Sequence, residues 1–340
     1  MTTLRTIDFH THILTQKAMR LLAKQAPAVA PVLKNLDDHG ATLEIGGKVV
    51  QQPLPREIWD VDLRLRDMDA NEIDVQVLSP TVFTFFYEQD SALAQACASL
   101  QNEEIAALVR RHPDRFLGLG SVPLQAPQAA ADELRRGMLQ LDLRGAMIGS
   151  NVNGRNLDDP ALEPFWASAT ELGAFIFIHP HAGAAGERLS AYYLKNLVGL
   201  PFETTIAAAC LVFGGVLERH PRLKICLAHG GGFVPYQAGR FQHGWEVRDE
   251  AKAHIHNPPG ESFGHLYYDT ILHSKSALEF LINSAGPDRV LLGSDYPFDM
   301  GNLDCVARVK ALSIGADARD LILGGYARSL FGEPARGSHA

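Results

Sequence analysis

The sequence predicts an α/β fold in which eight parallel strands and their helices close into a single (β/α)8, TIM-like barrel. Three observations favour this fold class. Apolar runs of strand length alternate with segments of helical periodicity along the 340 residues. Four of these runs end in a histidine or an aspartate and then break into a loop. The glycine-rich GxGxxG pattern that marks a dinucleotide-binding sheet does not follow the first run.

Each expected strand is a short run of mainly apolar residues. The eight runs are 6–10, 75–79, 116–122, 145–150, 175–179, 224–229, 265–270 and 290–295. Helical periodicity lies between most of them, at 91–111, 127–140, 161–172, 203–219 and 276–284. Because neighbouring parallel strands need a long crossover, usually a helix, this alternation predicts successive βαβ units.

The segment between the first two strands is too long for one helix. Residues 15–62 include the run Ile45–Val50, in which two glycines interrupt an alternating pattern, and this predicts a small hairpin. An insertion after the C-terminal end of a barrel strand hangs over the mouth of the barrel. We therefore expect one domain, 1–332, with 15–62 as a lid. The polar residues 333–340 are expected to form a flexible tail.

Composition narrows the range of partners. A net charge of -8 and a pI near 5.9 argue against nucleic acid, which requires a basic surface. We expect no membrane span, since we find no apolar run of about 18 residues, and the N-terminus lacks the pattern of a secretory signal. The four cysteines, Cys97, Cys210, Cys226 and Cys305, form no CxxC pair. They predict reduced thiols in a cytoplasmic protein that acts on a small molecule.

The first strand carries two histidines that point to one side. His10 and His12 flank Thr11, so their side chains lie on the same face of the strand, and Asp8 precedes them on that face. Two imidazoles that face the inside of a barrel can bind one metal ion. The alternative is a chance pair of histidines on a surface strand.

The ends of three later strands carry further polar residues. His179 follows a strongly apolar strand, and His181 lies just beyond Pro180, where it could contact a substrate. His229 precedes three glycines, and Asp295 ends the last strand. The alternative for His179 and His229 is that each is a core histidine. The alternative for Asp295 is that its side chain forms a turn before the proline. A serine hydrolase is disfavoured because the chain has no GxSxG nucleophile elbow.

Taken together, these motifs resemble the amidohydrolase superfamily, and within it the aminocarboxymuconate-semialdehyde decarboxylase family. The resemblance covers nearly the whole chain. It is carried by Asp8–His12, Trp59-Asp60 with Arg64, Met68-Asp69, Asp74–Val77, Val122–Gln125, Asn156–Asp159, His179-Pro180, Lys224–Gly232, Gly239-Arg240 and Leu292–Phe298.

The resemblance implies a metal-dependent enzyme with a defined site. One Zn²⁺ would be held by four side chains: His10, His12, His179 and Asp295. His229 would be the catalytic acid–base group. Arg240 would enter the site of a neighbouring subunit, so a homodimer is expected. The fourth strand ends without the lysine that bridges two metals in other members of the superfamily.

The expected activity is a zinc-dependent, non-oxidative decarboxylation of a carboxylated aromatic compound or an aromatic ring-cleavage product. The expected substrate contacts are Arg240, Phe298, His181, Trp59 and Gln52. Gln52 stands where the family carries an arginine that binds a substrate carboxylate. This departure keeps an alternative open, namely a metal-dependent hydrolase or hydratase of a related compound.

Overall fold

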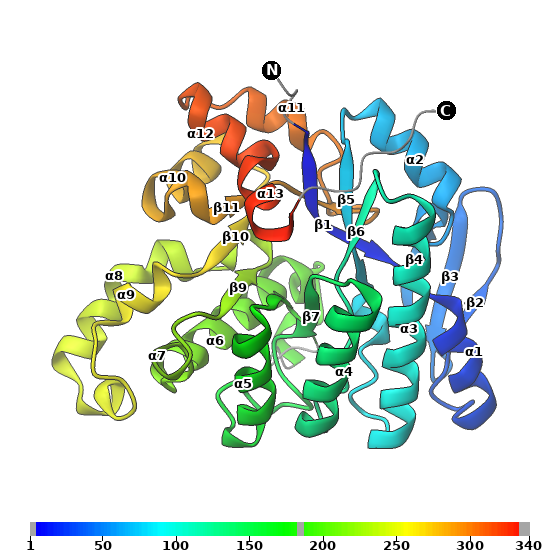
Figure 1. Cartoon of the computed structure of the whole chain (residues 1–340), viewed down its shortest axis with the longest axis horizontal. Coiled ribbons are helices and arrows are strands. Elements are labelled where there is room, and N and C mark those ends of the chain that lie inside the picture. The colour runs from blue at the N-terminus through cyan, green and yellow to red at the C-terminus, as the bar shows by residue number, and fades with distance from the viewer. Residues whose placement is uncertain (1–4, 182–186, 333–340) are drawn as a thin grey trace.

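The computed structural model describes residues 5–181 and 187–332, and it shows a barrel of parallel strands surrounded by helices (Figure 1). The strands begin and end close to the residues expected from the sequence. The barrel strands are β1 (Ile7–Ile13), β5 (Val75–Pro80), β6 (Phe116–Gly118), β7 (Gly145–Gly149), β8 (Phe175–His179), β9 (Lys224–Leu227), β10 (Tyr267–Asp269), β11 (Val290–Leu291) and β12 (Gly293–Tyr296).

Two parallel sheets make up the wall, in the orders β12-β1-β5-β6 and β11-β10-β9-β8-β7. The amide N–H of Arg144 donates to the carbonyl of Gly118 (2.9 Å), and that of Met147 donates to the carbonyl of Gly120 (2.9 Å), which joins β6 to β7. On the opposite side, β11 and β12 follow one another around Leu292, whose carbonyl accepts from the Phe9 N–H at 2.8 Å. The predicted barrel is therefore confirmed.

Helices connect the strands along the outside. Several begin with an aspartate whose side chain accepts hydrogen bonds from the first free N–H groups, as Asp90 does for α3. The helices are α1 (Gln16–Gln25), α2 (Val61–Ala70), α3 (Ser91–Arg111), α4 (Pro127–Leu141), α5 (Glu163–Leu172), α6 (Leu200–Phe213), α7 (Val216–Arg219), α8 (Val234–Val247), α9 (Pro259–Phe263), α10 (Lys275–Ala285), α11 (Cys305–Lys310), α12 (Ala316–Asp320) and α13 (Tyr326–Phe331). Shorter turns of helix are η1 (Arg56–Ile58), η2 (Val82–Thr84), η3 (Pro160–Leu162), η4 (Glu187–Leu189), η5 (Lys195–Gly199), η6 (His229–Gly231), η7 (Asp249–Lys252), η8 (Pro287–Arg289) and η9 (Leu321–Gly325).

One expected helix needs correction, and one stretch bears on the expectation that the chain has no membrane span. The helix expected at 203–219 is two helices, because Gly215 has a left-handed φ of 71° and ends α6 before α7 begins. In addition, η5 and α6 together form a stretch, Lys195–Phe213, that is long and apolar enough to cross a membrane. This stretch packs against α7, α8 and α9 as one of the outer helices of the barrel, so its length and composition are weak evidence for a span.

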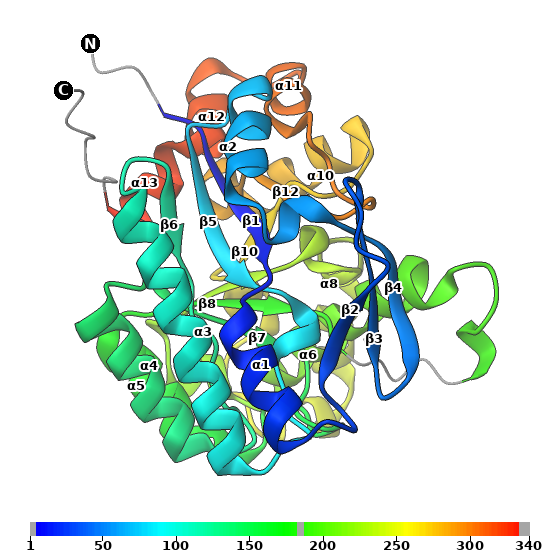
Figure 2. The same cartoon turned by 90° about the vertical axis from the view of Figure 1, so that its right-hand side faces the viewer.

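The insertion between β1 and β5 folds into a helix and an antiparallel sheet, which stands beside the barrel (Figure 2). The sheet contains β2 (Pro31–Lys34), β3 (Gly40–Ile45) and β4 (Lys48–Pro55). Gly46 and Gly47 turn β3 into β4 with φ values of 57° and 74°, which glycine adopts without strain. The expected hairpin is present, with a third strand added. The tail expected at 333–340 lies outside the described residues.

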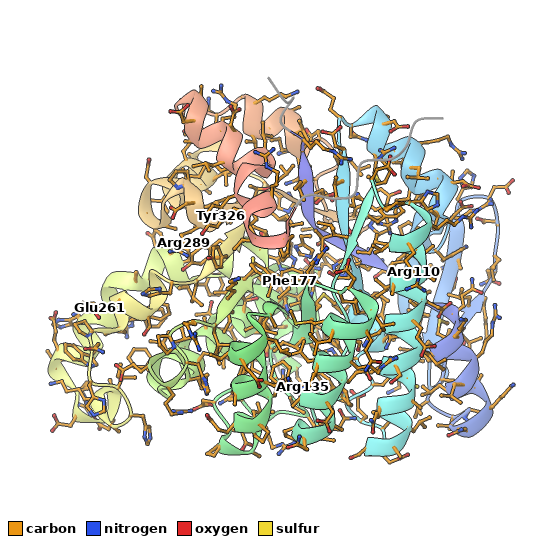
Figure 3. The ribbon with its side chains drawn as sticks, in the orientation of Figure 1. Arg110, Arg135, Phe177, Glu261, Arg289 and Tyr326 are labelled. Atoms are coloured by element: carbon orange, nitrogen blue, oxygen red, sulfur yellow. The ribbon has the colours of Figure 1, made fainter. Side chains whose placement is uncertain are left out.

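The barrel interior is filled by aromatic and aliphatic side chains. Phe177 of β8 lies at its centre, well inside the outer helices that carry Arg110 and Arg135 (Figure 3). Its ring meets the ring of Phe9 edge to face at 4.8 Å and that of His10 at 4.7 Å. The apolar core therefore ends directly beneath the polar residues of the strand ends.

Candidate active site

Four polar side chains from three strands meet at one point at the C-terminal end of the barrel. They are His10 and His12 from β1, His179 from β8 and Asp295 from β12. All four are buried, and each offers one ligand atom within 4.8 Å of the others. Parallel strands place their C-terminal ends at one rim of a barrel, which explains why residues so far apart in sequence meet here.

The three imidazoles are oriented by hydrogen bonds on their outer sides. Nδ1 of His10 lies 2.7 Å from Asp269 Oδ2, and Nδ1 of His179 lies 3.0 Å from the carbonyl of Pro180. Nδ1 of His12 lies 3.3 Å from the carbonyl of Pro80. Because each acceptor favours a proton on Nδ1, each ring presents the lone pair of Nε2 to the centre.

These Nε2 atoms form a site that fits a cation. His10 Nε2 and His12 Nε2 lie 3.1 Å apart, and both approach Asp295 Oδ1, at 3.2 and 3.1 Å. His179 Nε2 is buried and has no hydrogen-bond partner among the residues that the structure describes. Leaving a buried polar atom unpaired is costly, whereas a metal ion satisfies several lone pairs at once. The donor set of three imidazoles and one carboxylate suits a divalent transition metal.

The charges around the site support the same conclusion. Burial lowers the pKa of His10, but the negative charges of Asp295 and Asp269 outweigh it and raise the pKa to about 10. Burial lowers the pKa of His12 and, more strongly, that of His179. The two carboxylates thus favour one positive charge at this place, which a second proton on His10 supplies here and which a bound cation would supply in its stead. His12 and His179 are held neutral, the form in which histidine binds metal.

His229 lies beside this cluster at the start of a tight glycine turn. Its Nε2 is 3.4 Å from Asp295 Oδ2, and its ring centre is 5.0 Å from that of His179. His229 has a left-handed φ of 55°, and the three glycines after it have positive φ as well. The side chain is partly buried and lines the cavity, so it can exchange a proton with a bound molecule.

A buried polar chain behind the cluster sets β1 against β12. The Asp8 carboxylate accepts hydrogen bonds from Ser294 N–H (3.0 Å) and Ser294 Oγ–H (2.6 Å). It also accepts from Gln76 Nε2 (3.1 Å), and Gln76 in turn accepts from the buried guanidinium of Arg64 (2.9 Å). Arg64 also donates to the carbonyl of His12. This chain places Asp295 beside the histidines of β1.

A cavity of about 1360 Å³ opens above the cluster. This volume exceeds the roughly 300–1000 Å³ of common small-molecule sites. Phe83, Phe86 and Phe298 supply apolar wall, and the Phe298 ring centre lies 5.2 Å from that of His12. Residues of the insertion also line the cavity, including Ile45 and Val50.

The structure gives a different position for two of the expected substrate contacts. Gln52 is exposed and is not among the described residues that line the cavity, whereas its neighbour Gln51 is. Successive residues of a strand point to opposite faces, so only one of the two can face the cavity from β4. Trp59 packs behind the wall against a buried cluster that includes Leu54 and Ile58.

Of the other three expected substrate contacts, two line the cavity and one lies outside it. Phe298 and His181 both line the cavity. The His181 ring meets the rings of Phe85 and Tyr87 edge to face, and its Nε2 lies 3.9 Å from Glu88. Arg240 is exposed on α8 and does not line the described cavity of its own chain. This position leaves the guanidinium free to reach a neighbouring subunit, which stays a prediction.

Sequence reasoning did not single out Asp269. This residue ends β10 and is fully buried, and its carboxylate accepts hydrogen bonds from both His10 and the His229 turn. These hydrogen bonds outweigh burial and hold its pKa below the usual value. Its position could have identified it from the sequence, because it is a carboxylate at the end of an expected strand.

Comparisons with known proteins agree with this site. Residues 7–332 match the family described as Amidohydrolase, and the chain belongs to this family. The 2-amino-3-carboxymuconate-6-semialdehyde decarboxylase of Dictyostelium discoideum is 39% identical, over 96% of this chain and 91% of its own length. The resemblance seen in the motifs is thereby confirmed.

Two solved structures share the fold. A 5-carboxyvanillate decarboxylase from Sphingomonas paucimobilis gives a TM-score of 0.84 at 26% identity, covering 97% of this chain and 99% of that one. A dihydroxybenzoic acid decarboxylase from Polaromonas sp. gives a TM-score of 0.80 at 24% identity, with 96% of each chain covered. The latter was solved with bound manganese and the inhibitor 2-nitroresorcinol.

Proposed function

We propose that this protein is a divalent-metal-dependent, non-oxidative decarboxylase of a carboxylated aromatic compound or an aromatic ring-cleavage product. The observation that carries the proposal is the convergence of three Nε2 atoms and the Asp295 carboxylate beneath a cavity with apolar walls. The 39% identity to a named decarboxylase over nearly the whole chain supports the reaction class.

In this proposal His10, His12, His179 and Asp295 hold one metal ion, with zinc as the first choice because of the nitrogen-rich donor set. When bound, the ion supplies a Lewis acid that polarises an oxygen of the substrate. Manganese is the second choice, since a carboxylate ligand suits it and the Polaromonas dihydroxybenzoic acid decarboxylase of the same fold was solved with manganese. The protein's own contribution is to fix the rings from their outer sides, through the acceptors on Asp269, Pro180 and Pro80.

His229 acts as the acid–base group of the reaction. Asp295 Oδ2, at 3.4 Å, favours a proton on His229 Nε2, at the wall of the cavity. The imidazolium form of His229 donates this proton to the substrate carbon that bears the carboxylate, which leaves a neutral ring that takes up a proton from solvent for the next turnover. The bond to the carboxylate then breaks, its electron pair returns to the π system, and CO₂ leaves. A positioned general acid of this kind contributes roughly 10²–10⁴-fold to rate.

The cavity favours a flat substrate with polar edges. Phe83 and Phe298, whose ring centres are 6.1 Å apart and nearly perpendicular, offer apolar surface close to His12. His181 offers a polar contact on another part of the wall. Gln51 replaces Gln52 as the contact proposed for β4.

We further propose that the protein works as a homodimer in the cytoplasm. Exposed apolar side chains lie just before η5, at Tyr192, and on η5, α6 and α8, at Leu197, Phe202 and Tyr236. Arg240 is on α8 as well. Burying such a face against a second copy would bring Arg240 towards the partner. The four cysteines are free, which suits a reducing compartment.

Product analysis tests the reaction class. The metal-loaded protein is incubated in H₂¹⁸O with carboxylated muconates and with hydroxybenzoates that carry one or two carboxylates. A decarboxylase releases CO₂ and gives a product without solvent oxygen on carbon. A product that carries ¹⁸O and retains its carboxylate would instead establish the hydrolase or hydratase. Treatment with a chelator should abolish either activity, and re-addition of metal should restore it.

A further inference from the structure

Asp269 is the point where the metal-site residues and the acid–base residue are joined. It is completely buried at the end of β10, and each of its two oxygens accepts two hydrogen bonds. Oδ2 accepts from His10 Nδ1 (2.7 Å) and from the backbone N–H of His229 (2.8 Å). Oδ1 accepts from the backbone N–H groups of Gly230 (2.8 Å) and Ile271 (3.1 Å).

The two backbone donors from the His229 turn point at the same carboxylate because of their conformation. His229 and Gly230 have consecutive left-handed φ values of 55° and 61°. Successive N–H groups in such conformations form a concave site for an anion. In this protein the anion is a side chain of the neighbouring strand, so the turn is held to β10 by charge-assisted hydrogen bonds.

The approach of His10 to Asp269 also depends on a glycine. Gly293 of β12 pairs with His10 in the sheet, and a Cβ at this position would lie 2.9 Å from the Cβ of His10. It would also lie 3.2 Å from the Cβ of Asp269. The absence of a side chain at 293 thus lets the imidazole and the carboxylate meet from opposite sides of β12.

We propose that Asp269 is a positioning residue that orients His10 and His229 at the same time. Through Oδ2 it keeps a proton on His10 Nδ1, so that His10 Nε2 remains a metal ligand. Through both oxygens it holds the turn that delivers His229 to the cavity. Metal binding and proton transfer therefore share one carboxylate. The proposal builds on the proposed function, because it assigns roles to His10 and His229 in that reaction.

The test is the substitution Asp269→Asn in the full-length, zinc-loaded protein. An amide has one acceptor oxygen instead of two, and its N–H₂ group would face a donor. We expect the N–H₂ to take the place of Oδ2, because the His10 ring can become an acceptor there, whereas Oδ1 faces two backbone N–H groups. The proton on His10 then moves to Nε2, so that a metal ligand is lost, and the His229 N–H loses its acceptor. The matched control is Glu133→Gln, which neutralises a buried carboxylate on α4 that is held by Arg136 and Asn102.

Two measurements separate the two halves of the proposal. Competition with a chromogenic chelator should show about 10–100-fold weaker zinc binding in Asp269→Asn. At saturating zinc, kcat should remain at least about tenfold below that of the wild type, with a smaller change in KM, because the misplaced His229 is not corrected by metal. Glu133→Gln should match the wild type in both. Unchanged zinc affinity would overturn the role at His10, and full recovery of kcat with excess zinc would overturn the role at His229.

A third measurement needs neither turnover nor a folded variant. In the ¹⁵N-labelled, zinc-loaded wild type, His10 should carry a proton on Nδ1 that exchanges slowly with solvent, since Asp269 accepts it in a fully buried place. A rapidly exchanging Nδ1 proton, or zinc bound through Nδ1, would overturn the proposal. If the protein binds zinc with this signature but decarboxylates no tested acid, the proposed function fails while the role of Asp269 at His10 stands.

Discussion

The base of the cavity and its rim are built in different ways. The base is a set of buried side chains at the ends of barrel strands, and its three metal-site histidines are fixed by backbone or carboxylate acceptors. The rim comes from the insertion and from the segment around η5, where long and partly exposed side chains such as Gln51 and Lys195 face the cavity. The base determines the chemistry, and the rim determines which molecule reaches it.

The largest difference between base and rim should appear when one histidine is removed from each. We expect His229→Ala to lower kcat by at least about a hundredfold, because the positioned proton donor is lost. The variant should keep its metal, since His229 is not one of the four clustered ligand residues. Steady-state kinetics and metal analysis of the same sample test both statements.

The control for this experiment is His273→Ala. His273 also lines the cavity, but it is exposed, and its Nδ1 lies 3.0 Å from Asn302 rather than near Asp295. We expect its kcat to stay within about tenfold of that of the wild type, well above that of His229→Ala. Loss of metal from His229→Ala would make His229 a ligand, and equal losses of kcat in the two variants would remove the distinction between base and rim.

An intermediate effect is expected at the rim if a second subunit completes it. Arg240→Ala should raise KM or abolish turnover, because a guanidinium makes paired hydrogen bonds with a planar carboxylate. Mixing this variant with His229→Ala should restore partial activity, since one hybrid site then contains both intact groups. No recovery, despite confirmed exchange of subunits, would leave Arg240 as an ordinary surface residue.

The smallest effect is expected within β4. Gln51→Ala should raise KM by about two- to tenfold, the range expected for the loss of one hydrogen bond. Gln52→Ala, one residue away on the opposite face of the strand, should leave KM unchanged. Inhibition and turnover assays with the same substrate compare the two variants directly. A larger effect from Gln52→Ala would show that the partner subunit or a motion of the lid brings Gln52 into the site.

The difference between the base and the rim of the cavity also explains how much of the site could be predicted from the sequence. The strands that deliver His10, His179 and Asp295 are buried runs with clear polar ends, so both the barrel and the meeting of these residues followed from the order of the elements. The residues of the rim that face the cavity could not be predicted in this way. A shift of one residue in β4 exchanges Gln51 for Gln52, and the sequence pattern around two prolines does not determine which one faces inward.

Other features depended on contacts that no local pattern encodes. Asp269 could be placed at a strand end, but its four donors come from three separate segments of the chain. Trp59 was expected at the substrate because of its type and its motif, yet the insertion forms a small core of its own that takes up its ring. Long-range hydrogen bonds and the packing of an insertion are properties of the folded chain.

The central claim is that His10, His12, His179 and Asp295 bind one divalent metal ion. The most direct measurement is elemental analysis of the purified wild type and of His179→Ala, after dialysis against the same zinc-containing buffer. We predict about one metal ion per subunit in the wild type and strongly reduced occupancy in the variant, since one of four protein ligands is lost. Circular dichroism should confirm that the variant is folded. Full occupancy in a folded His179→Ala protein, or no bound metal in the wild type, would contradict this account of the site.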